Sequence, residues 1–286
     1  WNQVGTPGTT PDTFARVSPA ARRMDEMSVM SNDRNLVVNP EAHYGIAGDQ
    51  VGLQNQAMVK SAYEAAKIGR IAGLNTYASN NIKTHTVGAH GGTPLVNGGS
   101  QETTYAASKT TNTQSLVTDG WTNSTAVLKA GDVFTIAGVN AVNPVPGEGT
   151  TGKTAMNYLQ EFTVTADATS DGSGQATLTI APAIIVSGPY QTVSAAPVDN
   201  AAITVKGTAS TSYPINMAFH KNAFALVTCP LEMPDGVSWK GQESADGFSV
   251  RVVKQYDIDT DQDVIRLDVL YGWKAIYPDL ATRLIG

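Results

Sequence analysis

The segment with the most specific chemical pattern is residues 147–154, GEGTTGKT. It satisfies the phosphate-loop pattern G-x-x-x-x-G-K-[ST], in which loop amides cradle phosphates and the lysine, here Lys153, reaches them. That chemistry requires a buried strand before the loop and a helix after it. Here Pro144 and Pro146 interrupt any preceding strand, and the following MNYLQEFTVTAD soon alternates like a strand. We therefore expect a surface hairpin and no catalytic role for Lys153, which leaves a nucleotide-binding enzyme as a remote alternative.

A second polar segment, DIDTDQD, carries a series of aspartates: Asp257, Asp259, Asp261 and Asp263. Its first five residues are similar to the beginning of a calcium loop. Such a loop has Gly at the sixth position and Glu at the twelfth, whereas this chain has Gln262 and Asp268. We expect a polar hairpin turn, in which aspartates favour solvent or bond backbone amides.

The histidines and the cysteine form no recognisable catalytic or metal-binding set. No pair of histidines has the i, i+4 spacing of a zinc-binding helix among His43, His85, His90 and His220. The one cysteine, Cys229, excludes an intramolecular disulfide and a multi-cysteine zinc site, and we expect it to be buried in its apolar segment. The sequence therefore predicts no catalytic, cofactor-binding or metal-ligating residue, no cofactor and no enzyme.

Length and charge narrow the class of protein further. With 286 residues the chain is long enough for more than one domain. Its net charge of −6, from 19 basic and 25 acidic residues, argues against a strong nucleic-acid binder, which would carry a basic stripe. The sequence contains no apolar run long enough for a membrane span and no signal peptide.

The first 90 residues predict helices and short strands. A helix should begin at Ser18 as the cap and Pro19 as the first helical residue, with Ala20, Met24 and Met27 on one face. Helix formers also dominate residues 55–67.

Two further elements follow from the same part of the sequence. Residues 36–38 predict a short buried strand that ends at Asn39-Pro40. The glycines Gly69 and Gly73 predict a kinked strand that leads into a turn.

From about residue 90 to 213 the chain is rich in Thr, Ser, Gly and Ala. Apolar residues alternate with threonine in residues 162–166, 176–180 and 203–206. Turn-forming clusters such as residues 171–174 separate these runs. Short strands at this spacing predict a small antiparallel barrel or sandwich, in which Trp121 should be buried.

After residue 214 the composition returns to that of the first part. Residues 223–231 predict a nearly continuous buried strand, and residues 259–262 predict a hairpin turn between two alternating strands. Ile265, Leu267, Val269 and Tyr271 should share one face. We expect this face to be buried, so that Leu267→Asp abolishes soluble folding.

Four segments, in this order along the chain, together resemble tailed-phage major capsid proteins of the P22 type. The first contains the family's Gly-Arg-[Ile/Val]-Ala-Gly core. The segments are AKIGRIAGLNTYASNNIKTHTVG (66–88), LVTDGWTNSTAVLKAGDVFTIAGVNAVNP (116–144), MAFHKNAFALVTCPLEMP (217–234) and SVRVVKQYDIDTDQDVIRLDVLYGWKAIYPDLATRL (249–284).

The resemblance implies an α+β chain with the HK97-type capsid fold and an inserted antiparallel β-barrel domain. The host domain would comprise residues 1–96 and 214–286, and the barrel residues 97–213. It also implies a structural major capsid protein, without catalytic residues, that assembles into pentamers and hexamers of an icosahedral shell enclosing phage DNA. Scaffolding protein and portal are the implied partners, contact with packaged DNA would be non-specific, and the protein would reside in the virion after assembly in the bacterial cytoplasm.

One departure from the family concerns the N-terminal arm, extended loop and spine helix, which residues 1–30 do not supply. We therefore expect the 286-residue chain to remain a monomer or small oligomer by itself. The alternative function is another phage structural β protein, such as a decoration or tail component.

Overall fold

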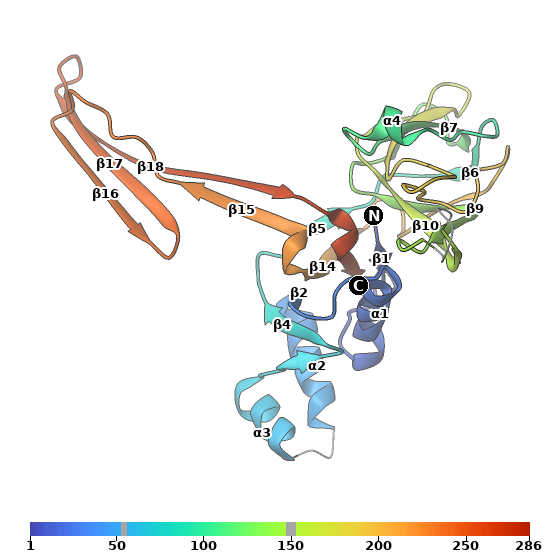
Figure 1. The fold of residues 1–286 in the computed structure, drawn as a ribbon, viewed down its shortest axis with the longest axis horizontal. Coiled ribbons are helices and arrows are strands. Elements are labelled where there is room, and N and C mark those ends of the chain that lie inside the picture. Colours follow the sequence, from blue (N-terminus) through green and yellow to red (C-terminus); the bar gives the residue numbers. More distant parts are fainter. Residues whose placement is uncertain (53–55, 147–152) are drawn as a thin grey trace. The chain divides into compact units, whose positions relative to one another are not determined.

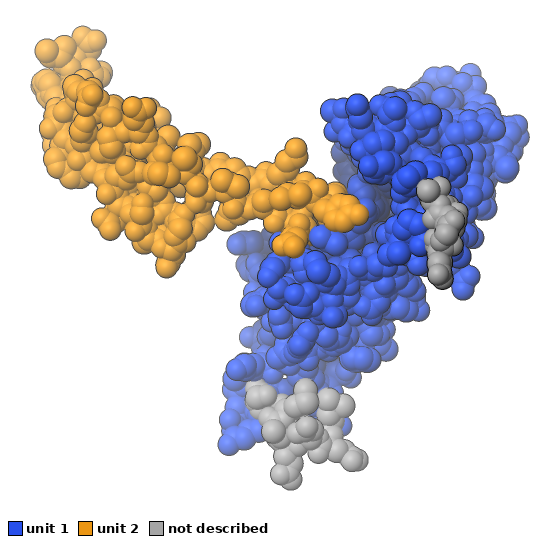
Figure 2. All heavy atoms as spheres, viewed as in Figure 1, with its two compact units in different colours: residues 1–221, 279–286 blue, residues 222–278 orange. Residues whose placement is uncertain are grey.

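The computed structural model describes residues 1–52, 56–146 and 153–286 and divides the chain into two compact units (Figure 1). Unit 1 comprises residues 1–221 and 279–286, and unit 2 comprises residues 222–278 (Figure 2). Unit 1 contains a mixed sheet with helices and a barrel-like sheet, whereas unit 2 contains a four-stranded sheet. The chain is thus α+β, as its sequence predicts.

The mixed sheet of unit 1 has the strand order β1-β19-β14-β2-β4-β3, and β5 also pairs with β14. The pairs β1–β19 and β2–β4 are parallel, so the first and last strands of the chain lie side by side. The strands are β1 (Gln3–Val4), β2 (Arg34–Val38), β3 (Arg70–Ile71), β4 (Leu74–Ala78), β5 (Thr84–Thr86), β14 (Ser212–His220) and β19 (Ala281–Ile285).

Helix α1 (Phe14–Glu26) begins earlier than the sequence predicts. Its N-cap is Thr13, and the Phe14 amide donates to the carboxylate of Asp49 at 3.2 Å. Pro19 therefore lies inside the helix, where it cannot donate to the carbonyl four residues earlier. The prediction of a cap at Ser18 was wrong: the helix starts at Phe14, whose amide is satisfied by Asp49 of a different helix and not by a local capping side chain, whereas the predicted apolar face with Met24 is confirmed.

Two more helices follow, α2 (Pro40–Val51) and α3 (Gln56–Ala65). Helix α3 matches the predicted helix, but α2 was not predicted. Its signal is nevertheless present, because Asn39 caps it by accepting from the Ala42 amide at 3.1 Å and Pro40 is its first residue.

Alternation along the strands places the core of the mixed sheet on the side of α1 and α2. Fully burying one such aliphatic side chain stabilises the fold by about 1.5–3 kcal/mol. This cluster includes Val17, Met24, Leu36, Val38, Ile46, Ala218 and Leu284.

The predicted kink and turn at Gly69 and Gly73 are confirmed by the hairpin of β3 and β4. Ile71 pairs with Leu74 across a two-residue turn. The backbone φ is +47° at Ala72 and +79° at Gly73, and two positive values in succession are typical of a type I′ turn.

The barrel-like sheet has the order β13-β9-β10-β12-β7-β6. An antiparallel bridge between Leu95 and Ala202 joins its two edges, and the Val96 amide donates to Ala201 at 3.0 Å. The elements are β6 (Gly92–Val96), α4 (Tyr105–Ser108), β7 (Gln114–Trp121), β8 (Ala126–Leu128), β9 (Val133–Val142), β10 (Ala155–Val164), β11 (Ala168–Thr169), β12 (Ala176–Ala181) and β13 (Ile203–Val205).

The inside of this sheet holds the largest apolar cluster of the described residues. Phe134 and Phe162 meet there with ring centroids 5.8 Å apart. Trp121 is buried as predicted, and its indole N–H donates to the Thr118 hydroxyl at 2.8 Å.

A buried carboxylate joins the barrel to the mixed sheet within unit 1. Glu161 on β10 is 2% exposed and forms ion pairs with Arg23 of α1, at 3.2 Å, and with Lys206 of the barrel. The Gln3 amide of β1 also donates to it, at 2.5 Å, and the Arg23 guanidinium lies 3.8 Å from the ring centroid of Tyr158. A buried charge persists only where paired and hydrogen-bonded, so this arrangement specifies how the barrel is attached.

We predict that Glu161→Gln lowers the free energy of unfolding by about 3–5 kcal/mol, because it leaves two cations without their buried partner. Urea unfolding followed by tryptophan fluorescence measures this loss. Glu64→Gln is the matched control, since Glu64 pairs with Lys60 on the surface and its loss should be nearly neutral. Equal stability of the two variants would contradict the prediction.

Candidate functional site

Unit 2 is an antiparallel sheet with the order β15-β18-β17-β16. Its strands are β15 (Phe224–Cys229), β16 (Trp239–Ala245), β17 (Phe248–Asp257) and β18 (Gln262–Ala275). The turn between β17 and β18 lies where the sequence predicts it. The long strand β18 pairs first with β17 and then with β15, without a shift of register.

One face of this sheet is apolar and exposed. On β18 the side chains of Ile265, Leu267, Val269, Tyr271 and Trp273 share this face, because side chains alternate along a strand. Cross-strand partners extend the face with Val250 and Val252 of β17 and Leu226 of β15, and Trp239 pairs with Lys254 at its margin. The five β18 side chains are 44–77% exposed, so the described chain leaves this face uncovered.

The opposite face is mixed: Val227, Val264 and Leu270 are exposed there, together with paired charges. Asp268 forms ion pairs with Arg251 and Arg266, each at 2.6 Å. Hydrogen bonds from these two guanidinium groups hold the pKa of Asp268 below its usual value. The two faces therefore differ in chemistry, and the uncovered apolar face is the candidate functional surface, since patches of this kind mark interaction sites.

Two predictions about this region were wrong in the same way. The strand predicted in residues 223–231 exists as β15, but most of its side chains are exposed, and Cys229 is exposed rather than buried. Leu267 lies on the predicted face, yet it is 70% exposed. The alternation identified which residues share a face, but it carries no information on whether another element covers that face.

The sequence candidate for a phosphate loop is followed by a strand and not by a helix. Residues 147–152 lie outside the described residues. Lys153 is described: its ammonium donates to the Gln191 carbonyl at 2.9 Å, and burial lowers its pKa. The strand β10, not a helix, begins at Ala155, so the helix N-terminus that would bind phosphate is missing after the loop.

The other sequence candidates are dispersed. His85 contacts Asp132 at 2.7 Å, and His90 contacts the Gly207 carbonyl at 3.2 Å. In the turn of unit 2, Asp257 accepts from the Asp259 amide and the Thr260 hydroxyl. In the described ranges no three His, Cys, Asp or Glu side chains converge as metal ligands would.

No helix of the described residues combines the length and the apolar composition that crossing a bilayer requires.

We predict that Leu267→Asp leaves the 286-residue chain soluble and folded, because an aspartate at this exposed position keeps its water. Circular dichroism melts should show a change of about 1 kcal/mol or less, the range of β-propensity effects. Leu178→Asp is the control: Leu178 is 0% exposed inside the barrel, and an unpaired charge there should abolish folding. Insolubility of both variants would show that the apolar face is covered within the chain.

Comparisons with known proteins identify the family of this chain. A curated major capsid protein of Acyrthosiphon pisum secondary endosymbiont phage 1 is 25% identical over 290 residues, which cover 99% of this chain and 68% of the relative. The family model described as "P22 coat protein - gene protein 5" matches residues 2–286. Because that match spans nearly the whole chain, the protein belongs to the P22 coat protein family.

Proposed function

We propose that this chain is a major capsid subunit with the HK97-type fold, which acts by assembling with copies of itself into an icosahedral shell and catalyses no reaction. The observation that carries this proposal is the apolar face of unit 2, defined by Ile265, Leu267, Val269, Tyr271 and Trp273. Soluble monomers rarely expose a continuous apolar surface of this kind. A subunit that functions only in an assembly can expose it, because neighbouring protein covers it there.

The energetics support this interpretation. Burying a side chain such as Leu267 or Trp273 is worth about 1.5–3 kcal/mol, so covering the whole face would contribute substantially to an interface. The opposite face is less continuously apolar, because the ion pairs of Asp268 lie between Val264 and Leu270. The continuous apolar face is thus suited to pack against a further layer of protein.

The remaining partners follow from family membership and charge. We propose pentamers and hexamers as capsomers, scaffolding protein and portal as assembly partners, and the virion as the final location after assembly in the bacterial cytoplasm. The net charge of −6 supports only non-specific contact with packaged DNA.

We further propose that the barrel is a domain inserted into a host domain. The sequence predicts that this domain begins at residue 97, which lies just after β6. The edge strand β6, with the buried Val96, belongs to the barrel-like sheet. The two segments that connect the barrel to the rest of unit 1 are joined by backbone hydrogen bonds. The Val87 amide donates to the Thr211 carbonyl, and the Ser210 amide donates to the Gly88 carbonyl. Residues 88–211 are therefore the better boundaries.

We predict that residues 88–211 fold alone, with β-type circular dichroism, a cooperative melt and a buried Trp121. Residues 97–213 should be less stable, since they lack β6 and the bridge from Leu95 to Ala202 that joins the two edges. Thermal melts of both segments measure the difference. A random-coil spectrum for residues 88–211 would refute an autonomous domain.

The test of the function itself uses phage particles. We predict that mass spectrometry of purified virions from the phage that encodes this chain finds it as the most abundant protein of isometric shells, as seen by negative-stain microscopy. A decoration or tail component would remain with fibres or tails, or dissociate without loss of the shell. Absence of this chain from the shell would overturn the proposed function.

A further inference from the structure

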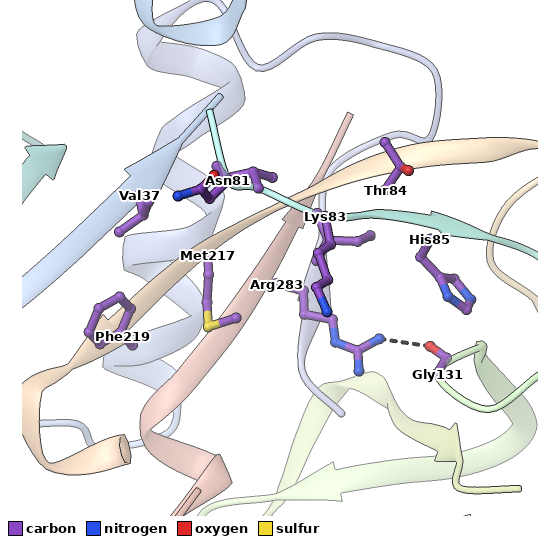
Figure 3. A pocket seen from close by; sticks show the side chains of 11 residues that line it. Val37, Asn81, Lys83, Thr84, His85, Gly131, Met217, Phe219 and Arg283 are labelled. Atoms are coloured by element: carbon purple, nitrogen blue, oxygen red, sulfur yellow. Dashed lines mark hydrogen bonds between the residues drawn. The ribbon is translucent and has the colours of Figure 1, made fainter. Parts of the chain in front are cut away.

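The mixed sheet of unit 1 carries a groove of about 620 Å³ on its surface (Figure 3). Its apolar lining includes Val37, Ile215, Met217 and Phe219. On β2 and β14 these side chains alternate with core residues such as Leu36 and Ala218, so they lie on the face opposite α1 and α2. The groove therefore lies on the face of the mixed sheet that is opposite its apolar core.

Of the two cations at this groove, Lys83 has no carboxylate partner among the described residues, whereas the nearby charge of Asp132 acts on Arg283 and raises its pKa against the effect of burial. Lys83 and Arg283 line the groove, and neither takes part in an ion pair of those residues. Arg283 donates to the Gly131 carbonyl at 2.7 Å, as Figure 3 shows. Burial lowers the pKa of Arg283, which means that its surroundings solvate the charge poorly.

A third polar residue of the groove, His85, is already engaged. It contacts Asp132, whose carboxylate also accepts from the Gly88 and Lys129 amides. Asp132 is thus committed within unit 1. The groove consequently suits a ligand that brings both an apolar side chain and a carboxylate of its own.

Unit 2 carries a segment with this chemistry in the turn between β17 and β18. Ile258 is 83% exposed, the highest value among the large apolar side chains of the described residues. Asp257 and Asp259 flank it. Asp257 is occupied by hydrogen bonds within the turn, whereas no ion pair of the described residues engages Asp259. The turn thus presents an apolar side chain beside an available carboxylate.

We propose that this turn of one copy docks into the groove of a second copy, which rests on the proposed function in self-assembly. Ile258 contacts the apolar lining, and the Asp259 carboxylate pairs with Lys83. The contact is heterologous, since the turn and the groove are different surfaces, and a heterologous contact can close a ring of subunits. This contact is too small to hold two copies together by itself. The experiment therefore traps the contact with a covalent cross-link.

The test uses the 286-residue chain with Cys229→Ser, which removes the one native thiol. One protein carries Thr84→Cys at the groove, and a second, of different mass, carries Gln262→Cys beside the turn. After mixing, a short bis-maleimide should yield the heterodimer. The control replaces Gln262→Cys by Ala195→Cys. Ala195 is exposed near Val198-Asp199, another exposed pair of an apolar and an acidic residue. We expect the yield with Gln262→Cys to be about tenfold higher.

A charge swap tests the ion pair directly. Lys83→Glu in the groove protein should lower the yield about tenfold, and Asp259→Lys in the partner should restore it. Circular dichroism confirms that each variant is folded. A yield no higher than with Ala195→Cys, or one that is insensitive to both charge reversals, would overturn the inference.

Different results would overturn the docking inference and the proposed function. If the chain dominates purified shells but Thr84→Cys and Gln262→Cys do not cross-link above the control, the docking inference is wrong and the capsid function stands. If the chain is absent from shells, the proposed function is wrong whatever the cross-linking shows.

Discussion

A β-sheet with one apolar face needs a second layer of protein to cover that face. The two units of the chain differ in how they meet this requirement. In unit 1 the helices α1 and α2 supply that layer for the mixed sheet, and the barrel supplies it for itself by joining its edges. Unit 2 has four strands and no helix. Its apolar face therefore stays in contact with water until another protein surface covers it. The hydrophobic effect that folds unit 1 internally is thus available in unit 2 for association.

Electrostatics act differently in the two units. In unit 1 the buried Glu161 accepts an amide and pairs with two cations from different elements, which orients the barrel with a precision that apolar contacts alone do not provide. In unit 2 the ion pairs of Asp268 lie on the face opposite the apolar one and keep that side compatible with water. A subunit of a shell needs both properties: a rigid interior and surfaces of defined polarity.

Family membership and the structure describe the protein at different levels. The P22 coat protein family accounts for the role in a capsid. The structure adds two uncovered surfaces, the apolar face of unit 2 and the groove that Arg283 and Lys83 line. The phosphate-loop pattern around Lys153, by contrast, precedes a strand and lacks the helix on which its chemistry depends.

The sequence by itself determined the periodic features of this protein. Alternation in residues 162–166 and 176–180 predicted barrel strands, the residues around Gly69 and Gly73 predicted a turn, and the shared face of Ile265 and Leu267 was assigned correctly. These features depend on local geometry, because a period of two follows from the pleat itself. Only the tertiary structure decided which faces are covered, since burial depends on elements distant in sequence. It showed Leu267 and Cys229 to be exposed, moved the start of α1 away from Pro19, and brought Glu161 together with Arg23, which lies 138 residues earlier.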